Sequence, residues 1–168
     1  MNPSALEGFP APEGLKLPPA RALMSLLSRA ESIGAPWSRF ARALMSDGRL
    51  DPQLRELVVL RVAFRRKCAY VLAGHLQIAA HCGLSRERID AATGAASIEQ
   101  AGGTGAAVIR AADELVDYGR MAPATRAQLE EFLGHEELIE IAMLAGQYVM
   151  VGMLCQTFDL IPEPAGGS

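Results

Sequence analysis

The chain has 168 residues, of which half are apolar and only 5% are aromatic, and its formal net charge at pH 7 is −3. This length suits a single domain with a substantial core. The small negative charge gives no support for binding to nucleic acid or to an acidic membrane surface. Three cysteines without the spacing of a disulfide framework indicate a reducing compartment. No signal segment or membrane-length apolar run is expected, so we predict a cytoplasmic protein.

The N-terminal residues 1–19 contain five prolines, which prevent a regular helix. We predict an irregular arm that is either loose or packed against the body or a neighbouring subunit. A helical domain is expected over residues 20–160, followed by a tail over residues 161–168.

Two helices are expected before residue 50. Apolar periodicity over residues 20–32 predicts the first helix, and Gly34 should end it. Pro36 suits the first turn of the second helix, which the Asp-Gly pair at 47–48 should end. Trp37 on this helix either faces a substrate or belongs to the core or an interface. The buried side of the second helix is expected to carry Trp37, Phe40, Ala41 and Leu44.

The remaining helices are predicted from their caps and apolar periodicity. Asp51 and Pro52 are a helix-start signal, and Gly83 should end the fourth helix in a left-handed conformation. The Gly- and Ala-rich residues 94–105 are expected to be a flexible linker or a cover over a pocket. No strand pattern is present, so the fold is predicted to be all-α with seven to eight helices. These later helices are expected over residues 52–66, 68–82, 85–94, 106–118, 123–134 and 136–158.

The last predicted helix, over residues 136–158, is apolar around most of its circumference. Such a helix is expected to be buried, either at the centre of the domain or between subunits. Tyr148 lies within it. Its hydroxyl either reaches the polar residues of the third and fourth helices or packs in the core and bonds to a single carbonyl.

Three ionisable side chains, Glu56, Cys68 and His75, interrupt the apolar patterns of the third and fourth helices. Cys68 and His75 are seven residues apart, so they share one face of a helix, with Val71 directly before His75 on that face. The apolar neighbours of Glu56 suggest that its carboxylate turns inward or lies at the edge of a pocket. A carboxylate and an imidazole in such a setting are suited to acid–base chemistry.

Cys68 lies near the start of the fourth helix, and two interpretations of it remain open. The helix N-terminus lowers the pKa of a thiol, and a neighbouring imidazolium would lower it further. Alternatively, Cys68 is a small buried apolar residue, which is common for free cysteine.

The spacing of Glu56, Cys68 and His75, followed by Cys-Gly-Leu-Ser-Arg-Glu-Arg-Ile at 82–89, resembles the carboxymuconolactone decarboxylase and AhpD-like superfamily. The resemblance spans about residues 20–160 and includes Ala-Ala-Asp-Glu-Leu at 111–115 and Gly-Gln-Tyr-Val-Met at 146–150. It implies an AhpD-like helical fold, a bend near Lys67, and a homo-oligomer, either a trimer or a hexamer.

The decarboxylase branch of this superfamily implies a lyase without metal or cofactor that acts on a small carboxylated lactone or a related acid. His75 would deliver the proton, Glu56 would orient it, and Cys68 would line the pocket. An arginine such as Arg61 would hold the substrate carboxylate. The residues expected to contact substrate are Tyr148, Arg61, Val71 and Tyr70.

The peroxidase branch has Cys-x-x-Cys, whose second cysteine would stand at position 71, where this chain has valine. Cys82 is about 21 Å from Cys68 along one helix, which is too far to replace it. A thiol-dependent alkylhydroperoxidase-like antioxidant protein is the alternative, but without the second cysteine we expect no turnover of peroxide with a dithiol reductant. An isomerase and a non-catalytic small-molecule-binding protein also remain open.

Overall fold

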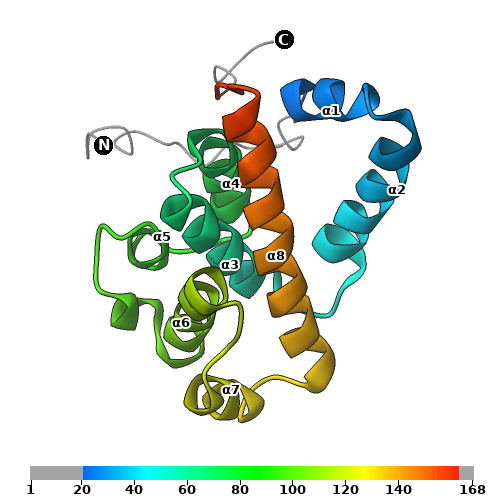
Figure 1. Cartoon of the computed structure of the whole chain (residues 1–168). Helices are drawn as coiled ribbons and strands as arrows, with labels where there is room; N and C mark the ends of the chain where they lie inside the picture. Colours follow the sequence, from blue (N-terminus) through cyan, green and yellow to red (C-terminus); the bar gives the residue numbers. More distant parts are fainter. Residues whose placement is uncertain (1–20, 163–168) are drawn as a thin grey trace.

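The computed structural model describes residues 21–162. Within this range the chain forms eight α-helices, a π-helical segment and a 3-10 segment, without a strand (Figure 1). The prediction of an all-α fold is confirmed. The proposed arm of residues 1–19 and most of the proposed tail lie outside the described residues.

The first two helices meet at a corner and lie beside the rest of the molecule (Figure 1). They are α1 (Arg21–Ser28) and α2 (Glu31–Arg42), which continues into the π-helical segment Ala43–Asp47. The predicted boundary at Gly34 and Pro36 is wrong, because α2 begins before both residues. Gly34 instead lies against the backbone carbonyl of Leu27, where a Cβ atom would collide. Its missing side chain lets the two helices approach closely.

The side of α2 that was predicted to be buried is only partly covered. Leu44 is buried and Trp37 is partly buried, but Phe40 is exposed. The reason is that α2 packs mainly on α1 and the π-helical segment. Its other side faces a cavity.

The central helix is α3 (Pro52–Arg65), as the start signal predicts. The Asp51 carboxylate caps it by accepting hydrogen bonds from the backbone N–H groups of Gln53 at 2.8 Å and Leu54 at 3.2 Å. Helices on several sides enclose α3, namely α4 (Ala69–His81), α5 (Arg86–Ala92), α6 (Gly103–Tyr118) and α8 (His135–Thr157). This enclosure leaves no solvent-facing side over residues 56–60.

The turn between α3 and α4 is a sharp bend at Lys67, which has a φ of 53°. This confirms the bend that the resemblance implies and places Cys68 at the N-cap of α4. At the other end, Gly83 has a φ of 77°, so the predicted left-handed cap is confirmed. Ser85 then caps α5 by accepting a hydrogen bond from the N–H of Arg88.

The segment 94–105 is more ordered than the predicted linker. It contains the 3-10 segment Ile98–Ala101, and α6 begins at Gly103. Ala101 and Gly105 are buried, so this segment packs against the core. The short α7 (Pro123–Glu130) then leads to α8.

Helix α8 has a buried side in the core and an exposed apolar side. The exposed side chains are between 39% and 51% accessible, so within one chain this helix is not buried all round. By length and composition α8 could cross a membrane, contrary to the prediction that no run is long enough, but 50% of its most apolar 18-residue stretch is buried. A core helix of a soluble protein can have the same length and apolar composition. The exposed apolar side comprises Ile139, Met143, Met150 and Met153.

Candidate functional site

Glu56 is a fully buried carboxylate in the second turn of α3. Its Oε2 atom lies 2.8 Å from Nδ1 of His75, and its Oε1 atom lies 3.5 Å from Nε of Arg55. Burying a carboxylate is costly unless donors compensate for the lost water. His75 and Arg55 supply these donors, so the inward orientation predicted for Glu56 is confirmed.

His75 lies on α4 and connects Glu56 to Tyr148 of α8. Its Nε2 atom lies 3.0 Å from the Tyr148 hydroxyl, and the two rings meet edge-on with centroids 4.9 Å apart. Because the carboxylate can only accept, Nδ1 of His75 carries a hydrogen. In the neutral imidazole, Nε2 then accepts the hydroxyl hydrogen of Tyr148.

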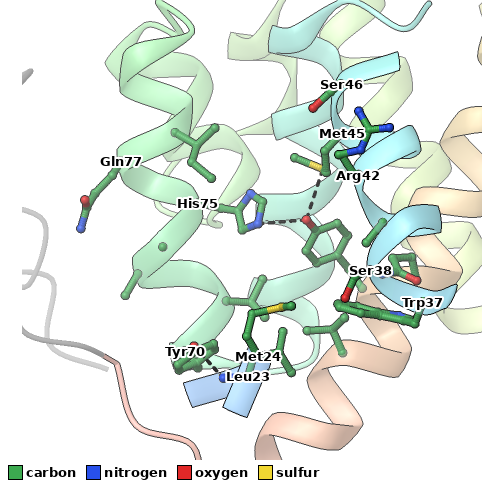
Figure 2. A pocket seen from close by; sticks show the side chains of 18 residues that line it. Leu23, Met24, Trp37, Ser38, Arg42, Met45, Ser46, Tyr70, His75 and Gln77 are labelled. Carbon is green, nitrogen blue, oxygen red and sulfur yellow. Dashed lines mark hydrogen bonds between the residues drawn. The ribbon is translucent and has the colours of Figure 1, made fainter. Parts of the chain in front are cut away.

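Tyr148 ends this chain of hydrogen bonds. Burial raises the pKa of its hydroxyl, and the nearby Glu56 carboxylate raises it further, so the hydroxyl remains a donor over the physiological range. It also lies 3.3 Å from Sδ of Met45, in the π-helical segment (Figure 2). Of the two alternatives for Tyr148, the structure has the one in which the hydroxyl reaches the Glu56–His75 pair.

A cavity of about 430 Å³ lies beside His75 and Tyr148. Its walls come from α1, α2, the π-helical segment, α4 and α8. Figure 2 shows Trp37 and Ser38 on one side and His75 on the other. This volume matches the usual size of a small-molecule site, and the polar groups are few.

Two buried polar atoms in the wall have no hydrogen-bond partner among the described residues. They are Nε1 of Trp37 and Oε1 of Gln147, a donor and an acceptor. Buried polar groups normally have partners. A bound molecule that accepts from Trp37 and donates to Gln147 would provide them.

The cavity wall contains few ionisable side chains. Among its described residues, Arg42 and His75 are the two that can carry a positive charge, and none is an aspartate or a glutamate. Arg42 is exposed and lies 3.3 Å from Asp47, a weak pair in solvent. Its guanidinium group is therefore available to an anion at the cavity. In Figure 2 it lies beside Met45.

Three of the predicted substrate contacts, Tyr70, Val71 and Tyr148, line the cavity. The Tyr70 hydroxyl also accepts a hydrogen bond of 3.2 Å from the backbone N–H of Leu23, which links α1 to α4. Tyr70 therefore helps to place one wall of the cavity.

Arg61, the arginine that the sequence suggested for holding a carboxylate, does not line the cavity. It donates through Nε and Nη2 to both carboxylate oxygens of Asp113, each at 2.7 Å. Arg65 binds the same carboxylate. Arg61 belongs to an ion-pair network between α3 and α6, and the cation at the cavity is Arg42.

Cys68 is buried at the N-cap of α4 and does not line the cavity beside His75. It faces Cys155 of α8, and both line a second cavity of about 310 Å³. The Cys155 thiol lowers the pKa of Cys68 to about 6, assisted by the backbone N–H groups of Val71 and Tyr70 and opposed by burial. The start of α4 lowers the pKa of Cys68 as predicted, but the main cause of the lowered pKa is the Cys155 thiol and not His75.

The sequence analysis missed three side chains: Arg42, Gln147 and Cys155. Gln147 had a recognisable signal, since it is a polar residue in the middle of an apolar helix. Cys155 lies seven residues from Tyr148 on α8 and so shares a face with it, but its contact with Cys68 depends on how α8 packs on α4. Arg42 had no distinguishing signal, because its exposed position on α2 is typical of a solvated charge.

Comparison with known proteins supports the resemblance. Residues 32–114 match the model of the Carboxymuconolactone decarboxylase family, so the family is confirmed for this segment. The segment contains Glu56, Cys68 and His75 but ends before Tyr148 and Cys155. No curated protein is similar enough to be matched.

Proposed function

We propose that this carboxymuconolactone decarboxylase-family chain is a cofactor-independent lyase that removes carbon dioxide from a small carboxylated lactone or related keto acid. The observation that carries the proposal is the hydrogen-bonded chain Glu56–His75–Tyr148 in the wall of a cavity of about 430 Å³. A buried carboxylate, an imidazole and a phenol in this order can move a proton without a metal.

Proton delivery begins from the imidazolium form of His75. In that form Nε2–H donates to the oxygen of Tyr148, which frees the hydroxyl hydrogen for the cavity. The fully buried Glu56 carboxylate, 2.8 Å from Nδ1, stabilises the imidazolium. Because the pKa of Tyr148 is raised, a phenolate would be unstable. Its proton must therefore be replaced from His75 in the same step.

The cavity wall can hold the substrate through its other polar groups. Arg42 would bind the carboxylate that is not lost, or the leaving carboxylate before the reaction. Trp37 Nε1–H, which lacks a partner, would donate to a carbonyl oxygen as loss of carbon dioxide makes it an enolate. The carbon of that enolate then takes the proton from Tyr148.

An isomerase is the second candidate, because the same chain of groups could remove a proton from one carbon and return it to another. Tyr148 would then pass the proton to neutral His75, whose Nε2 atom is 3.0 Å away. Arg42 in the cavity wall favours an acidic substrate in both cases. Release of carbon dioxide separates the two reactions.

The proposal is tested by screening lactone and keto acids for carbon dioxide release and product mass. His75→Ala, Glu56→Gln and Tyr148→Phe should each lower the rate by about two to four orders of magnitude, the range for positioned acid–base groups. The matched control is His81→Ala, since His81 is on the same helix but outside the cavity. Equal activity in the His75→Ala and His81→Ala proteins would place the site elsewhere.

Assembly is part of the same proposal. The exposed apolar side of α8, formed by Ile139, Met143, Met150 and Met153, is a contiguous stripe of the kind that marks protein interfaces. We assign it to contacts between copies of this chain, in the trimers or hexamers that the resemblance implies.

A further inference from the structure

Helices α4 and α8 contact each other at two levels. At one level His75 meets Tyr148 at 3.0 Å. At the other, Cys68 meets Cys155. His75 follows Cys68 by seven residues, and Tyr148 precedes Cys155 by seven. The two helices are therefore antiparallel along this contact, and the levels are two helical turns, or about 10 Å, apart.

The helix backbones approach closely at the cysteine level. Gly152 lies one turn before Cys155 on α8, and a Cβ atom placed on it would be 3.8 Å from the Cβ of Cys68. Both cysteines are buried and have free thiols. At this separation, side chains with a single methylene group can meet across the interface, as a disulfide requires.

The two thiols are chemically unequal. The pKa of Cys68 falls to about 6, chiefly because the Cys155 thiol donates to it and also because N–H groups at the start of α4 point to it. The pKa of Cys155 is raised, chiefly by Cys68 and also by burial. Cys68 is therefore the thiol that more readily forms the attacking thiolate, and Cys155 is the one that keeps its proton.

A small reagent can reach this pair. The second cavity, about 310 Å³, has both cysteines in its wall and extends to the exposed residues Lys67, Asp159 and Ile161. The charged side chains that face it are Lys67 and Asp159, one of each sign. A small neutral oxidant would enter without a charge penalty.

We propose that Cys68 and Cys155 form a reversible disulfide that links α4 to α8 when a small hydroperoxide oxidises the protein. This inference does not depend on the proposed lyase activity. It also differs from a Cys-x-x-Cys pair, because the partner sulfur comes from another helix.

The disulfide forms in two steps. The Cys68 thiolate attacks the oxygen of the hydroperoxide that carries hydrogen, and the O–O bond breaks. The other oxygen leaves and takes up a proton from solvent to become an alcohol or water. Cys68 is now a sulfenic acid. The Cys155 sulfur then attacks the Cys68 sulfur, and the sulfenic oxygen leaves as water with the Cys155 proton. Two thiols are oxidised to one disulfide, and one hydroperoxide is reduced.

The disulfide would fix the distance between the two helices that carry His75 and Tyr148. The hydrogen bond between these side chains lies two turns from the proposed disulfide on both helices. The redox state of the cysteine pair therefore controls how freely this contact can open.

The test uses the reduced full-length protein, hydrogen peroxide, N-ethylmaleimide to block the remaining thiols, and trypsin. Cys68 and Cys82 lie in one tryptic peptide, residues 68–86, whereas Cys155 lies in residues 127–168. We expect these two peptides to become linked, with the link lost on treatment with dithiothreitol. The Cys82→Ser protein should give the same link, which assigns it to Cys68.

Two further arms complete the test. Cys155→Ala should give no linked peptides, and dimedone should trap its Cys68 as the sulfenic acid. Oxidised glutathione, a much bulkier oxidant, should form the link much more slowly than hydrogen peroxide. Maleimide on both Cys68 and Cys155 after peroxide treatment, a link within residues 68–86, or links only between chains would overturn the proposal. The wild-type result decides this even if a variant does not fold.

Discussion

Nδ1 of His75 lies 2.8 Å from a Glu56 carboxylate that solvent does not reach. This pair should determine stability as well as activity. Replacing His75 by alanine leaves a buried carboxylate with Arg55, at 3.5 Å, as its remaining donor. We expect the free energy of unfolding to fall by about 3 kcal/mol, as for other broken buried pairs. Urea denaturation followed by circular dichroism measures it.

The control for this prediction is the double variant Glu56→Gln, His75→Ala. It removes the buried charge together with its partner, so part of the lost stability should return. A double variant as unstable as the sum of both single variants would mean that the two side chains do not interact energetically.

The raised pKa of Tyr148 predicts a loss of stability at alkaline pH. Because the folded-state pKa lies above the ordinary value of 10.0, the folded protein holds this proton more tightly than the unfolded chain does. The resulting stability is fully present below pH 10 and decreases as the pH rises above it. Tyr148→Phe should weaken this decrease. Thermal unfolding of both proteins between pH 8 and pH 11 tests it, and parallel curves would contradict it.

Much of the fold follows from local signals. The caps at Asp51, Gly83 and Ser85 depend on side-chain acceptors or on backbone freedom within a few residues, so the sequence predicts them correctly. The boundary at Gly34 fails for a reason outside its own segment. This glycine is needed for contact with α1, and its position relative to Leu27 depends on tertiary packing.

The candidate site divides in the same way. Glu56 and His75 are recognisable from the sequence because a charged group buried in an apolar helix is costly unless it has a hydrogen-bonding partner. The choice between Arg61 and Arg42 depends on which carboxylates lie nearby, and Asp113 comes from a helix far along the chain. Cys155 becomes a partner of Cys68 only because α8 is antiparallel to α4, which periodicity within one helix cannot reveal.

The two arginines can be distinguished experimentally. Arg42→Gln should weaken binding of a carboxylated ligand by about tenfold to a hundredfold, the range for hydrogen bonds to charged groups, with little effect on stability. Arg61→Gln should leave binding unchanged but lower the free energy of unfolding by about 1–3 kcal/mol, because Asp113 loses a bidentate partner. Trp37 is the single tryptophan of the chain and lines the cavity, so its fluorescence reports binding. Weaker binding in the Arg61→Gln protein and unchanged binding in the Arg42→Gln protein would show that Arg61 holds the carboxylate.

The exposed apolar side of α8 predicts the behaviour of the chain in solution. Met143 and Met150 are both exposed and lie seven residues apart on this side, so they occupy the centre of the stripe. If copies of the chain associate there, Met143→Lys with Met150→Lys places two desolvated charges in the interface. The wild type should be a trimer or hexamer by light scattering at micromolar concentration, and the double variant should dissociate while its circular dichroism stays helical.

The control is Tyr118→Lys, because Tyr118 is a more exposed side chain at the end of α6. This substitution should leave the mass unchanged. If the wild type is a monomer, the stripe is not an interface between copies of the chain. If the double lysine variant stays oligomeric, the interface lies on another surface.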